Sequence, residues 1–183
     1  LLTILAKSQG IEIIYDEVQT GFHLGRDFFW FKSFNMKDSE GQEVFPDYLT
    51  SAKKSQTGFV LAFNGEKSIN SEINYTSILR GFYQGLISDQ QKEKILNLEN
   101  MVVENLLKLN KKYKEFSYPR ARGLAFSIDC ENNEQIMSFI KNRFSLGLLI
   151  YPAGDKTLRF RINTAFKKEE IEYLFNALDK LAA

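Results

Sequence analysis

Short apolar runs, each closed by polar residues or glycine, occupy the first part of the chain. Leucine and isoleucine side chains within residues 1–9 predict a short helix that ends at Gly10. The next run, Ile11–Tyr15, is apolar or β-branched apart from one glutamate, which predicts a short buried strand. Polar residues begin at Asp16, so any chemistry here is expected at the carboxyl end of that strand.

Two further strands are predicted after this one. Tyr48–Thr50 follows a Pro-Asp pair, and the apolar run at 59–63 is closed by Asn64-Gly65. The segment 21–46 predicts a helix followed by an exposed loop. It contains a group of aromatic residues for which a core or dimer contact is favoured over a ligand cage. These residues are Phe28, Phe29, Trp30, Phe31 and Phe34.

A change of pattern near residues 87–90 predicts a boundary between two domains, 1–87 and 88–183. Ser88 is expected to cap the amino terminus of a long charged helix. One apolar stripe along this helix predicts core packing rather than a cofactor site. The stripe consists of Ile95, Val102, Leu106, Leu109 and Tyr113.

The rest of the chain alternates strands with helices, which predicts a small α/β domain. The expected elements are strands at 124–129, 148–151 and 157–162, a helix at 131–144 and a closing helix. The closing helix has one apolar face, made of Ile171, Leu174, Phe175, Leu178 and Leu181.

Composition narrows the class of protein. With 183 residues, of which 44% are hydrophobic and 26% charged, the chain can bury a globular core. No apolar run approaches the ~20 residues of a membrane-spanning helix, and residues 1–10 lack the basic start and cleavage site of a signal peptide. We therefore expect a cytoplasmic location and no membrane partner. A net charge of +1 gives no field for binding nucleic acid.

The single cysteine, Cys130, excludes an internal disulfide. It follows an apolar run at 124–128, so a buried or edge structural thiol is favoured over a nucleophile. No metal site is expected.

Two motifs, DEVQTG at 16–21 and PDYLTSAKK at 46–54, resemble the class III aminotransferases, pyridoxal-phosphate enzymes of fold type I. Within that family the resemblance is greatest to the L-lysine 6-aminotransferases. It rests there on AKKSQTGFVLA at 52–62, YPRARGL at 118–124 and YPAGDKTLRFR at 151–161. The order of these motifs is that of the family's carboxyl-terminal half.

The resemblance implies an α/β fold made of two parts. Residues 1–87 would be the end of the large domain that binds the cofactor, with a mostly parallel sheet and helices. Residues 88–183 would be the carboxyl-terminal small domain. It also implies a homodimer. Because the family's amino-terminal half would carry the phosphate-binding loop, we expect a truncated chain that is inactive and binds the cofactor poorly by itself.

The resemblance assigns roles around the cofactor ring. Asp16 would keep the ring nitrogen protonated, which strengthens the ring as an electron sink. Val18 would pack on a ring face and Gln19 would bind the ring hydroxyl. Lysine is the residue type that can bond to the cofactor's aldehyde and also move a proton. Of two adjacent lysines only one can face the ring, and the resemblance selects Lys53 over Lys54. Asp16, Gln19 and Lys53 are expected to converge on one pocket.

Two more residues receive roles from the resemblance. Thr76 would reach across a dimer interface to the partner's cofactor phosphate, although residues 77–79 depart from the family pattern, and an ordinary interface or capping threonine is the alternative. Arg159 alternates with Phe160 and shares a face with Arg161. Its guanidinium suits a carboxylate, and the resemblance makes it the arginine that meets a substrate carboxylate or a glutamate. A structural arginine is the alternative.

The function implied is pyridoxal-phosphate-dependent transfer of a terminal amino group, with L-lysine as the amino donor and 2-oxoglutarate as the acceptor. The substrates would thus be an amino acid and a 2-oxo acid. One alternative is another ω-aminotransferase, acting on 4-aminobutyrate or ornithine. The other is a non-catalytic remnant that keeps the fold but makes no complete site.

Overall fold

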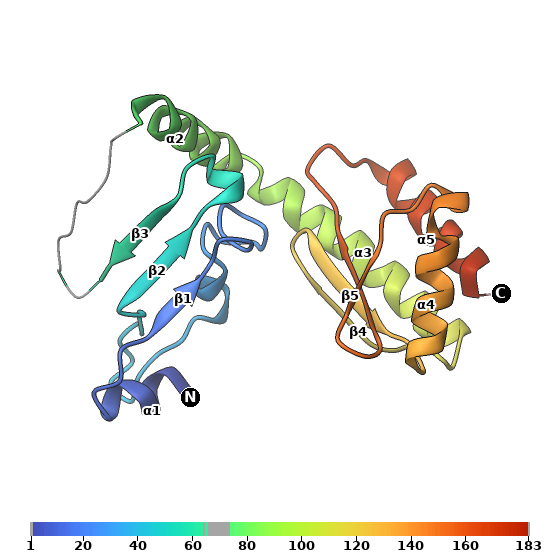
Figure 1. Ribbon diagram of the computed structural model, residues 1–183, viewed down its shortest axis with the longest axis horizontal. Helices are drawn as coiled ribbons and strands as arrows, with labels where there is room; N and C mark the ends of the chain where they lie inside the picture. Colours follow the sequence, from blue (N-terminus) through green and yellow to red (C-terminus); the bar gives the residue numbers. More distant parts are fainter. Residues whose placement is uncertain (1, 64, 66–73, 183) are drawn as a thin grey trace. The chain divides into compact units, whose positions relative to one another are not determined.

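The structure, a computed structural model, describes residues 2–63, 65 and 74–182 (Figure 1). Asn64 of the predicted Asn-Gly turn lies outside these residues. The chain divides into two compact units, Leu1–Lys92 and Glu93–Ala183.

The first unit contains a three-stranded mixed sheet in the order β1-β2-β3. Strand β1 (Ile14–Asp16) runs parallel to β2 (Tyr48–Ser51), and β2 runs antiparallel to β3 (Phe59–Ala62). The helices of this unit are α1 (Leu2–Ser8) and α2 (Tyr75–Asp89). All three strands predicted for this half are therefore present.

Helix α1 ends at the predicted glycine. Gly10 has a φ of +68° and its N–H donates to the carbonyl of Lys7 at 3.0 Å, while the N–H of Ile11 donates to the carbonyl of Ala6 at 3.0 Å. These two bonds satisfy carbonyl groups that the end of a helix leaves unpaired. The helix at 1–9 and its end are confirmed.

The prediction of a buried strand from Ile11 is wrong in two respects. The strand begins at Ile14, and the side chains of Ile11 and Ile14 are 57% and 63% exposed. Residues 11–13 instead connect α1 to the strand. In this connection the carboxylate of Asp47 accepts a hydrogen bond from the N–H of Ile13 at 2.8 Å. Asp16, expected just after the strand, is its last residue.

The predicted helix within 21–46 is also wrong, since the structure has only one 3-10 turn there, η1 (Trp30–Phe34). The backbone has φ values of +60° at Phe22 and +56° at His23, in the left-handed region that cannot continue a helix. Phe31 is buried and its ring lies 5.5 Å from that of Tyr15. The expected core role of the aromatic residues is confirmed for Phe31, whereas Phe34 is exposed.

Ser88 does not cap the long helix α3 (Lys92–Lys112), contrary to the prediction. It is buried within the last turn of α2, where its hydroxyl accepts a hydrogen bond from the amide of Gln84 at 3.3 Å. The division between the two units falls after Lys92, in the first turn of α3. The cap of α2 is Asn74, whose side chain accepts from the N–H of Ser77 at 3.0 Å.

The second unit contains a four-stranded antiparallel sheet in the order β4-β5-β7-β6. Its elements, after α3, are β4 (Ser117–Arg122), β5 (Ala125–Asp129), α4 (Asn133–Asn142), η3 (Arg143–Leu146), β6 (Tyr151–Ala153), β7 (Thr157–Arg161) and α5 (Lys168–Ala182). The strand expected at 148–151 begins only at Tyr151, and β4 was not predicted. The other expected elements are present with ends shifted by a few residues.

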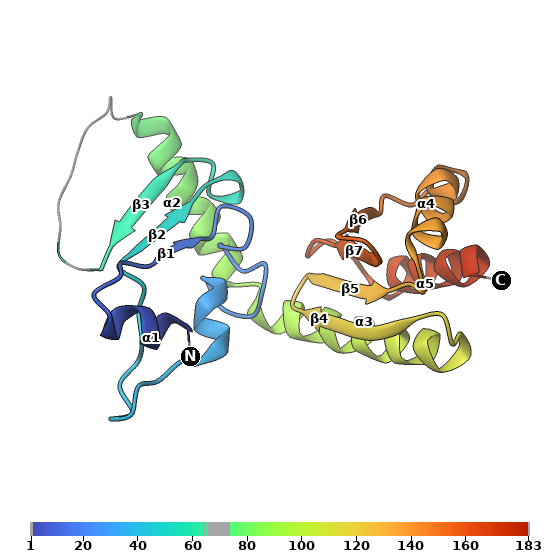
Figure 2. The same cartoon turned by 60° about the horizontal axis from the view of Figure 1, so that its bottom comes forward.

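Helices cover one face of this sheet. Phe126 on β5 stacks on Phe160 of β7 with ring centres 4.8 Å apart, and on Phe175 of α5 at 6.0 Å. Figure 2 shows α3 running beside β4 and β5. The core packing predicted for α3 is confirmed, because the stripe is buried at Ile95, Val102, Leu106 and Leu109 and only Tyr113 is partly exposed. The apolar face of α5 is likewise buried at Ile171, Phe175 and Leu178.

Cys130 follows β5 and is buried. Burial disfavours the thiolate, and with the smaller effect of the Asp129 charge it raises the pKa of the Cys130 thiol to about 12. A thiol that stays protonated is a poor nucleophile. The predicted burial of Cys130 is confirmed. None of the described helices is long and apolar enough to cross a membrane.

Candidate active site

The carboxyl ends of β1 and β2 lie side by side in the first unit. In this parallel pair Asp16 is opposite Thr50. One carboxylate oxygen of Asp16 accepts from the N–H of Val18 at 3.0 Å and from the hydroxyl of Thr50 at 3.3 Å. The expectation that two neighbouring parallel strands end at the same edge is confirmed for this pair.

The buried carboxylate of Glu17 fixes the loop that follows β1. Its two oxygens accept from the N–H groups of Trp30 at 2.6 Å and Phe31 at 2.8 Å, and the hydroxyl of Thr20 also donates to it at 3.3 Å. Glu17 thus satisfies the first N–H groups of η1 from 13 and 14 residues away. Sequence reasoning missed this residue, because its partners are backbone groups that no local pattern reveals.

The amine of Lys53 lies against the amide of Gln19. Lys53 Nζ donates to Gln19 Oε1 at 2.5 Å, and the Lys53 side chain is exposed. Lys53 begins the 3-10 turn η2 (Lys53–Ser55) with a φ of +58°. A left-handed backbone conformation at a lysine costs roughly 1 kcal/mol or more of conformational free energy, so the surrounding structure must hold this turn in place.

Lys54 points elsewhere. Its Nζ donates to the carbonyl oxygen of Phe22 at 2.5 Å, and its side chain is partly buried. The two adjacent lysines are therefore separated in role: Lys53 presents an exposed amine at the edge of the sheet, whereas Lys54 binds the loop that follows Gly21.

Helix α2 packs closely on the η2 turn. A Cβ added to Gly81 would lie 2.8 Å from the carbonyl oxygen of Ser55, a distance that real Cβ contacts do not reach. On the other side of the turn, Ser55 Oγ donates to the carbonyl of Thr57 at 2.5 Å. Gly81 is thus a second residue that sequence reasoning missed, and a glycine within an otherwise helical segment was the signal available for it.

The only histidine of the chain, His23, ties the same loop to the end of α2. Its side chain is fully buried, with Nδ1 3.3 Å from the carbonyl oxygen of Arg26 and Nε2 3.3 Å from a carboxylate oxygen of Asp89. Asp89 also pairs with Lys92 at 2.8 Å. Burial, as the largest cause, lowers the pKa of His23.

The remaining two predicted residues belong to other elements of the chain. Thr76 is exposed in the first turn of α2. Arg159 belongs to the second unit, on β7, where its guanidinium carbon lies 5.8 Å from the centre of the Tyr151 ring. The structure therefore brings together Asp16, Val18, Gln19 and Lys53.

Similarity to known proteins extends over most of this chain. The family model described as aminotransferase class-III matches residues 76–182. Acetylornithine aminotransferase of Vibrio vulnificus (strain YJ016) is 28% identical over an alignment that covers 93% of this chain and 44% of that protein. The chain thus spans less than half the length of this relative.

Solved structures show the same fold. Lysine aminotransferase from M. tuberculosis superposes with a TM-score of 0.82 at 21% identity, over 98% of this chain and 43% of that one. Ornithine aminotransferase from Plasmodium yoelii gives a TM-score of 0.75 at 20% identity, over 99% and 50%. The fold is that of part of a fold type I aminotransferase. The chain belongs to the class-III aminotransferase family.

Enzymes of this family depend on pyridoxal phosphate. The donor set at the edge of the sheet fits that group. It offers a carboxylate (Asp16) for a ring nitrogen, an amide (Gln19) for a ring hydroxyl, an apolar side chain (Val18) for a ring face and an exposed amine (Lys53) for an aldehyde. When bound, the cofactor would act as an electron sink for the bonds around an amino-acid α or ω carbon.

Proposed function

We propose that this chain carries the lysine and the ring-binding residues of a pyridoxal-phosphate-dependent aminotransferase. One observation carries the proposal: the Lys53 amine lies 2.5 Å from the Gln19 amide, on the edge where Asp16 ends β1. Lys53 is thereby brought to Asp16 and Gln19, which lie more than 30 residues earlier in the sequence, by two adjacent parallel strands.

In this proposal each residue has one task. Asp16 holds a proton on the ring nitrogen, Val18 packs on the ring and Gln19 orients both the ring hydroxyl and the Lys53 amine. With the cofactor bound, Lys53 would be the amine that holds its aldehyde carbon and the base that moves a proton at the donor carbon. Thr76 binds a cofactor phosphate held by a second copy of the chain.

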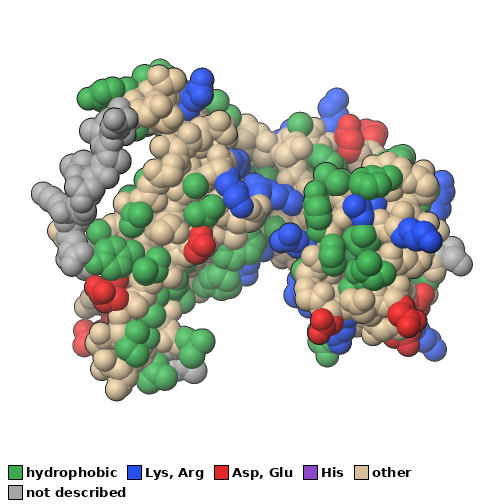
Figure 3. Space-filling model, in the orientation of Figure 1, with side chains coloured by type: hydrophobic (Ala, Val, Ile, Leu, Met, Phe, Trp, Pro, Cys, Tyr) green, Lys and Arg blue, Asp and Glu red, His purple; other side chains and the backbone are tan. Residues whose placement is uncertain are grey.

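The proposal assigns residues 1–87 to the end of the large domain and residues 88–183 to the small domain. It also includes a homodimer, which a row of exposed apolar side chains on α2, the helix that carries Thr76, supports. Figure 3 shows hydrophobic side chains along the top of this helix. The row consists of Tyr75, Ile78, Leu79, Phe82, Tyr83, Leu86 and Ile87. A cytoplasmic location completes the proposal.

For the reaction, we propose transfer of the ε-amino group of L-lysine to 2-oxoglutarate. The sequence motifs at 118–124 and 151–161 support this donor, and Arg159 would bind a substrate carboxylate. The runner-up is another ω-amine, such as ornithine, because DEVQTG at 16–21 and the lysine at 53 are features common to the family. A panel of lysine, ornithine and 4-aminobutyrate, with glutamate formation as the readout, separates these donors.

The site itself is tested by chemical labelling. Pyridoxal phosphate is added to the full-length protein, reduced onto its lysine with borohydride, and located by peptide mapping. We expect a single label, on Lys53. A label on Lys54 or on surface lysines alone would reject the proposed site.

We also propose that residues 1–183 alone bind the cofactor weakly and are inactive. Asp16, Gln19 and Lys53 supply groups for the ring and the aldehyde but none for the phosphate, which is the most highly charged part of the cofactor. Titration of the purified chain measures this, and tight stoichiometric labelling of Lys53 would contradict it.

A further inference from the structure

The loop that follows Gly21 is held at two neighbouring residues by groups from other elements. At Phe22 the carbonyl oxygen accepts from Nζ of Lys54 at 2.5 Å. At His23 the imidazole is fully buried, and its Nε2 lies 3.3 Å from a carboxylate oxygen of Asp89 at the end of α2. Figures 1 and 2 show this loop beside η2 and the end of α2. The loop therefore connects the turn that carries the two lysines to the helix.

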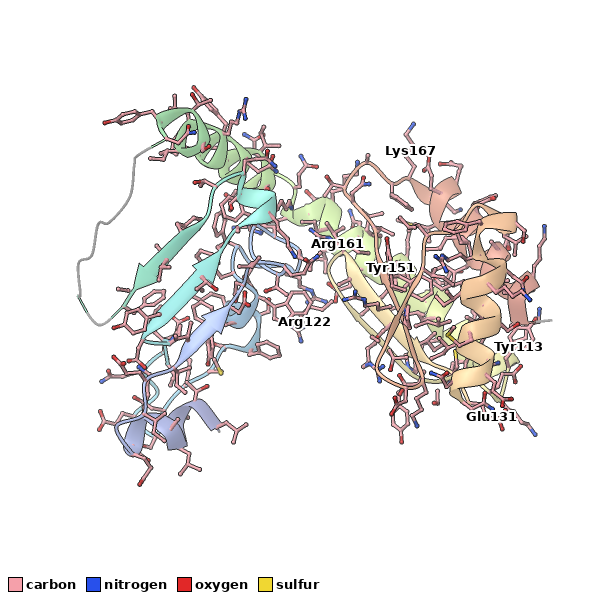
Figure 4. All side chains as sticks on the ribbon, in the orientation of Figure 1. Tyr113, Arg122, Glu131, Tyr151, Arg161 and Lys167 are labelled. Atoms are coloured by element: carbon pink, nitrogen blue, oxygen red, sulfur yellow. The ribbon has the colours of Figure 1, made fainter. Side chains whose placement is uncertain are left out.

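Helix α2 contacts both the loop and the turn. A Cβ added to Gly81 would lie 2.8 Å from the carbonyl oxygen of Ser55 in η2, and one added to Gly85 would lie 3.5 Å from the ring of Phe28. The ring of Phe28 meets that of His23 edge to face, with centres 5.3 Å apart. Figure 4 shows side chains filling the space where the loop, η2 and α2 meet. Because this region is closely packed, a shift of the loop is transmitted to η2.

Hydrogen bonding fixes the tautomer of the neutral imidazole. Nδ1 lies 3.3 Å from the carbonyl oxygen of Arg26, which can only accept, so Nδ1 of His23 carries the proton. Nε2 then has a lone pair, and among the residues that the structure describes it has no hydrogen-bond partner. A second proton would therefore go to Nε2, on the side that faces Asp89.

Charges facing the imidazole come from three elements. Asp89 of α2 favours a proton on it, whereas Lys92 at the start of α3 and Lys54 of η2 oppose one. On its own loop the contact is the carbonyl of Arg26. Burial is the largest effect and lowers the pKa of His23, so the imidazole is neutral at neutral pH. A positive imidazole would repel the Lys54 ammonium group and compete with Lys92 for Asp89.

We propose that His23 is a positioning residue for Lys53, and that it loosens the η2 turn when it takes up a proton on Nε2. While the imidazole is neutral, the Phe22 carbonyl stays in place for Lys54. That bond supports the turn, whose left-handed first residue directs the Lys53 amine to Gln19. The loosened turn keeps Lys53 but directs its amine less firmly. The inference rests on the proposed function, because Lys53 is the lysine that would hold the cofactor.

The first test uses the reciprocity of linked equilibria. If a proton on His23 weakens the bond of Lys54, removal of the Lys54 charge must favour that proton by the same free energy. The chain has one histidine, so NMR of its imidazole gives the pKa of His23 directly. We expect Lys54→Met to raise this pKa. Lys53→Met is the matched control, because it removes the same charge at the adjacent residue, whose amine points to Gln19, and it should leave the pKa unchanged.

The second test measures the turn itself. Hydrogen exchange of the N–H groups of residues 54–57 in the purified chain, corrected for the intrinsic effect of pH, reports the opening of η2. We expect protection to fall by roughly threefold or more as His23 takes up its proton, and to stay constant with pH in His23→Asn. Asparagine tolerates a positive φ such as the +56° found at His23, and it does not titrate.

The N–H groups of β3, in the same unit, are the control for this exchange. An equal fall of protection there would show a general loss of stability and would overturn the inference. So would an unchanged pKa of His23 in Lys54→Met, or an equal rise in Lys53→Met. If one variant is unfolded, the measurement on the other decides alone. Failure of pyridoxal phosphate to label Lys53, with the linkage between His23 and Lys54 intact, would reject the proposed function and leave this coupling in place.

Discussion

The Lys53 amine and the Gln19 amide meet at 2.5 Å although 34 residues separate them in the sequence. Parallel pairing of β1 with β2 brings the two segments together, and the left-handed turn at Lys53 directs the amine toward the edge of the sheet. Lys54, the next residue, points to the carbonyl of Phe22 instead. The turn therefore exposes the amine of Lys53, while the amine of Lys54 binds the backbone of the loop after Gly21.

The first prediction follows from that separation. In the full-length protein Lys53→Ala should abolish cofactor labelling by borohydride, whereas Lys54→Met should retain it. Lys54→Met should also lower the free energy of unfolding by roughly 1–2 kcal/mol, because the Phe22 carbonyl loses a charged donor. Peptide mapping and urea unfolding measure the two effects. Loss of label in Lys54→Met alone would mean that the roles of the lysines are reversed.

The second prediction concerns the packing of α2 on the η2 turn. Gly81→Ala places a Cβ 2.8 Å from the Ser55 carbonyl oxygen, so either the helix or the turn must move. We expect a loss of roughly 1–3 kcal/mol in unfolding free energy and weaker labelling of Lys53.

Gly85→Ala is the control for this change, since it lies one turn further along the same helix. A Cβ at Gly85 would meet the rings of Phe28, at 3.5 Å, and Phe22, at 3.7 Å, which are ordinary contacts. Alanine is the better helix former, so Gly85→Ala should be neutral or slightly stabilising. Similar losses in both variants would show that the close approach of Gly81 to Ser55 does not hold the turn.

The accuracy of the sequence-based predictions differs between local and long-range features. Periodicity alone predicted α3 and α5, because the buried stripes at Ile95–Leu109 and Ile171–Leu178 lie within single helices. Strand β4 was missed, because its pairing with β5 is interrupted between Ser117 and Arg120 and its residues include two arginines and a proline. An alternating pattern is hard to recognise in such a segment.

The candidate site was predictable only in part for the same reason. Motifs at the ends of two strands identified Asp16, Gln19 and Lys53 through their resemblance to a family. Glu17 and Gly81 act on backbone groups far along the chain, at Trp30 and Ser55, so no spacing in the sequence indicates them. The left-handed residues at Phe22 and His23 were unexpected because such conformations favour glycine.

The third prediction tests Glu17. Glu17→Gln keeps the size of the side chain but replaces one acceptor oxygen by an amide that donates, so either Trp30 or Phe31 loses its partner. We expect the free energy of unfolding to fall by roughly 1.5–3 kcal/mol. Trp30 is the only tryptophan of the chain, so its fluorescence reports the unfolding of the first unit. Glu40→Gln, at an exposed position, should change this by less than about 0.5 kcal/mol; an equal loss there would contradict the assigned role.

The fourth prediction is a pH dependence that comes from His23. Burial lowers the pKa of His23 in the folded protein, while in the unfolded chain it returns to about 6.5. The unfolded state therefore binds a proton more readily, and the free energy of unfolding should fall as the pH falls below about 6.5. The slope can reach about 1.4 kcal/mol per pH unit and should level off once the pH is below the folded pKa. Stability from the neutral imidazole is fully present above pH 6.5.

This dependence can be assigned to one residue because the chain has a single histidine. The carboxyl group that faces it, that of Asp89, does not titrate in that window, since Lys92 holds the pKa of Asp89 below its usual range. The other charges near His23, those of Lys54 and Lys92, stay positive there and further oppose its protonation. Urea unfolding followed by Trp30 fluorescence between pH 5 and 7, in the chain and in His23→Gln, measures the slope. We expect His23→Gln to be nearly independent of pH in this range, and an unchanged slope in the variant would show that another group controls the acid sensitivity of the first unit.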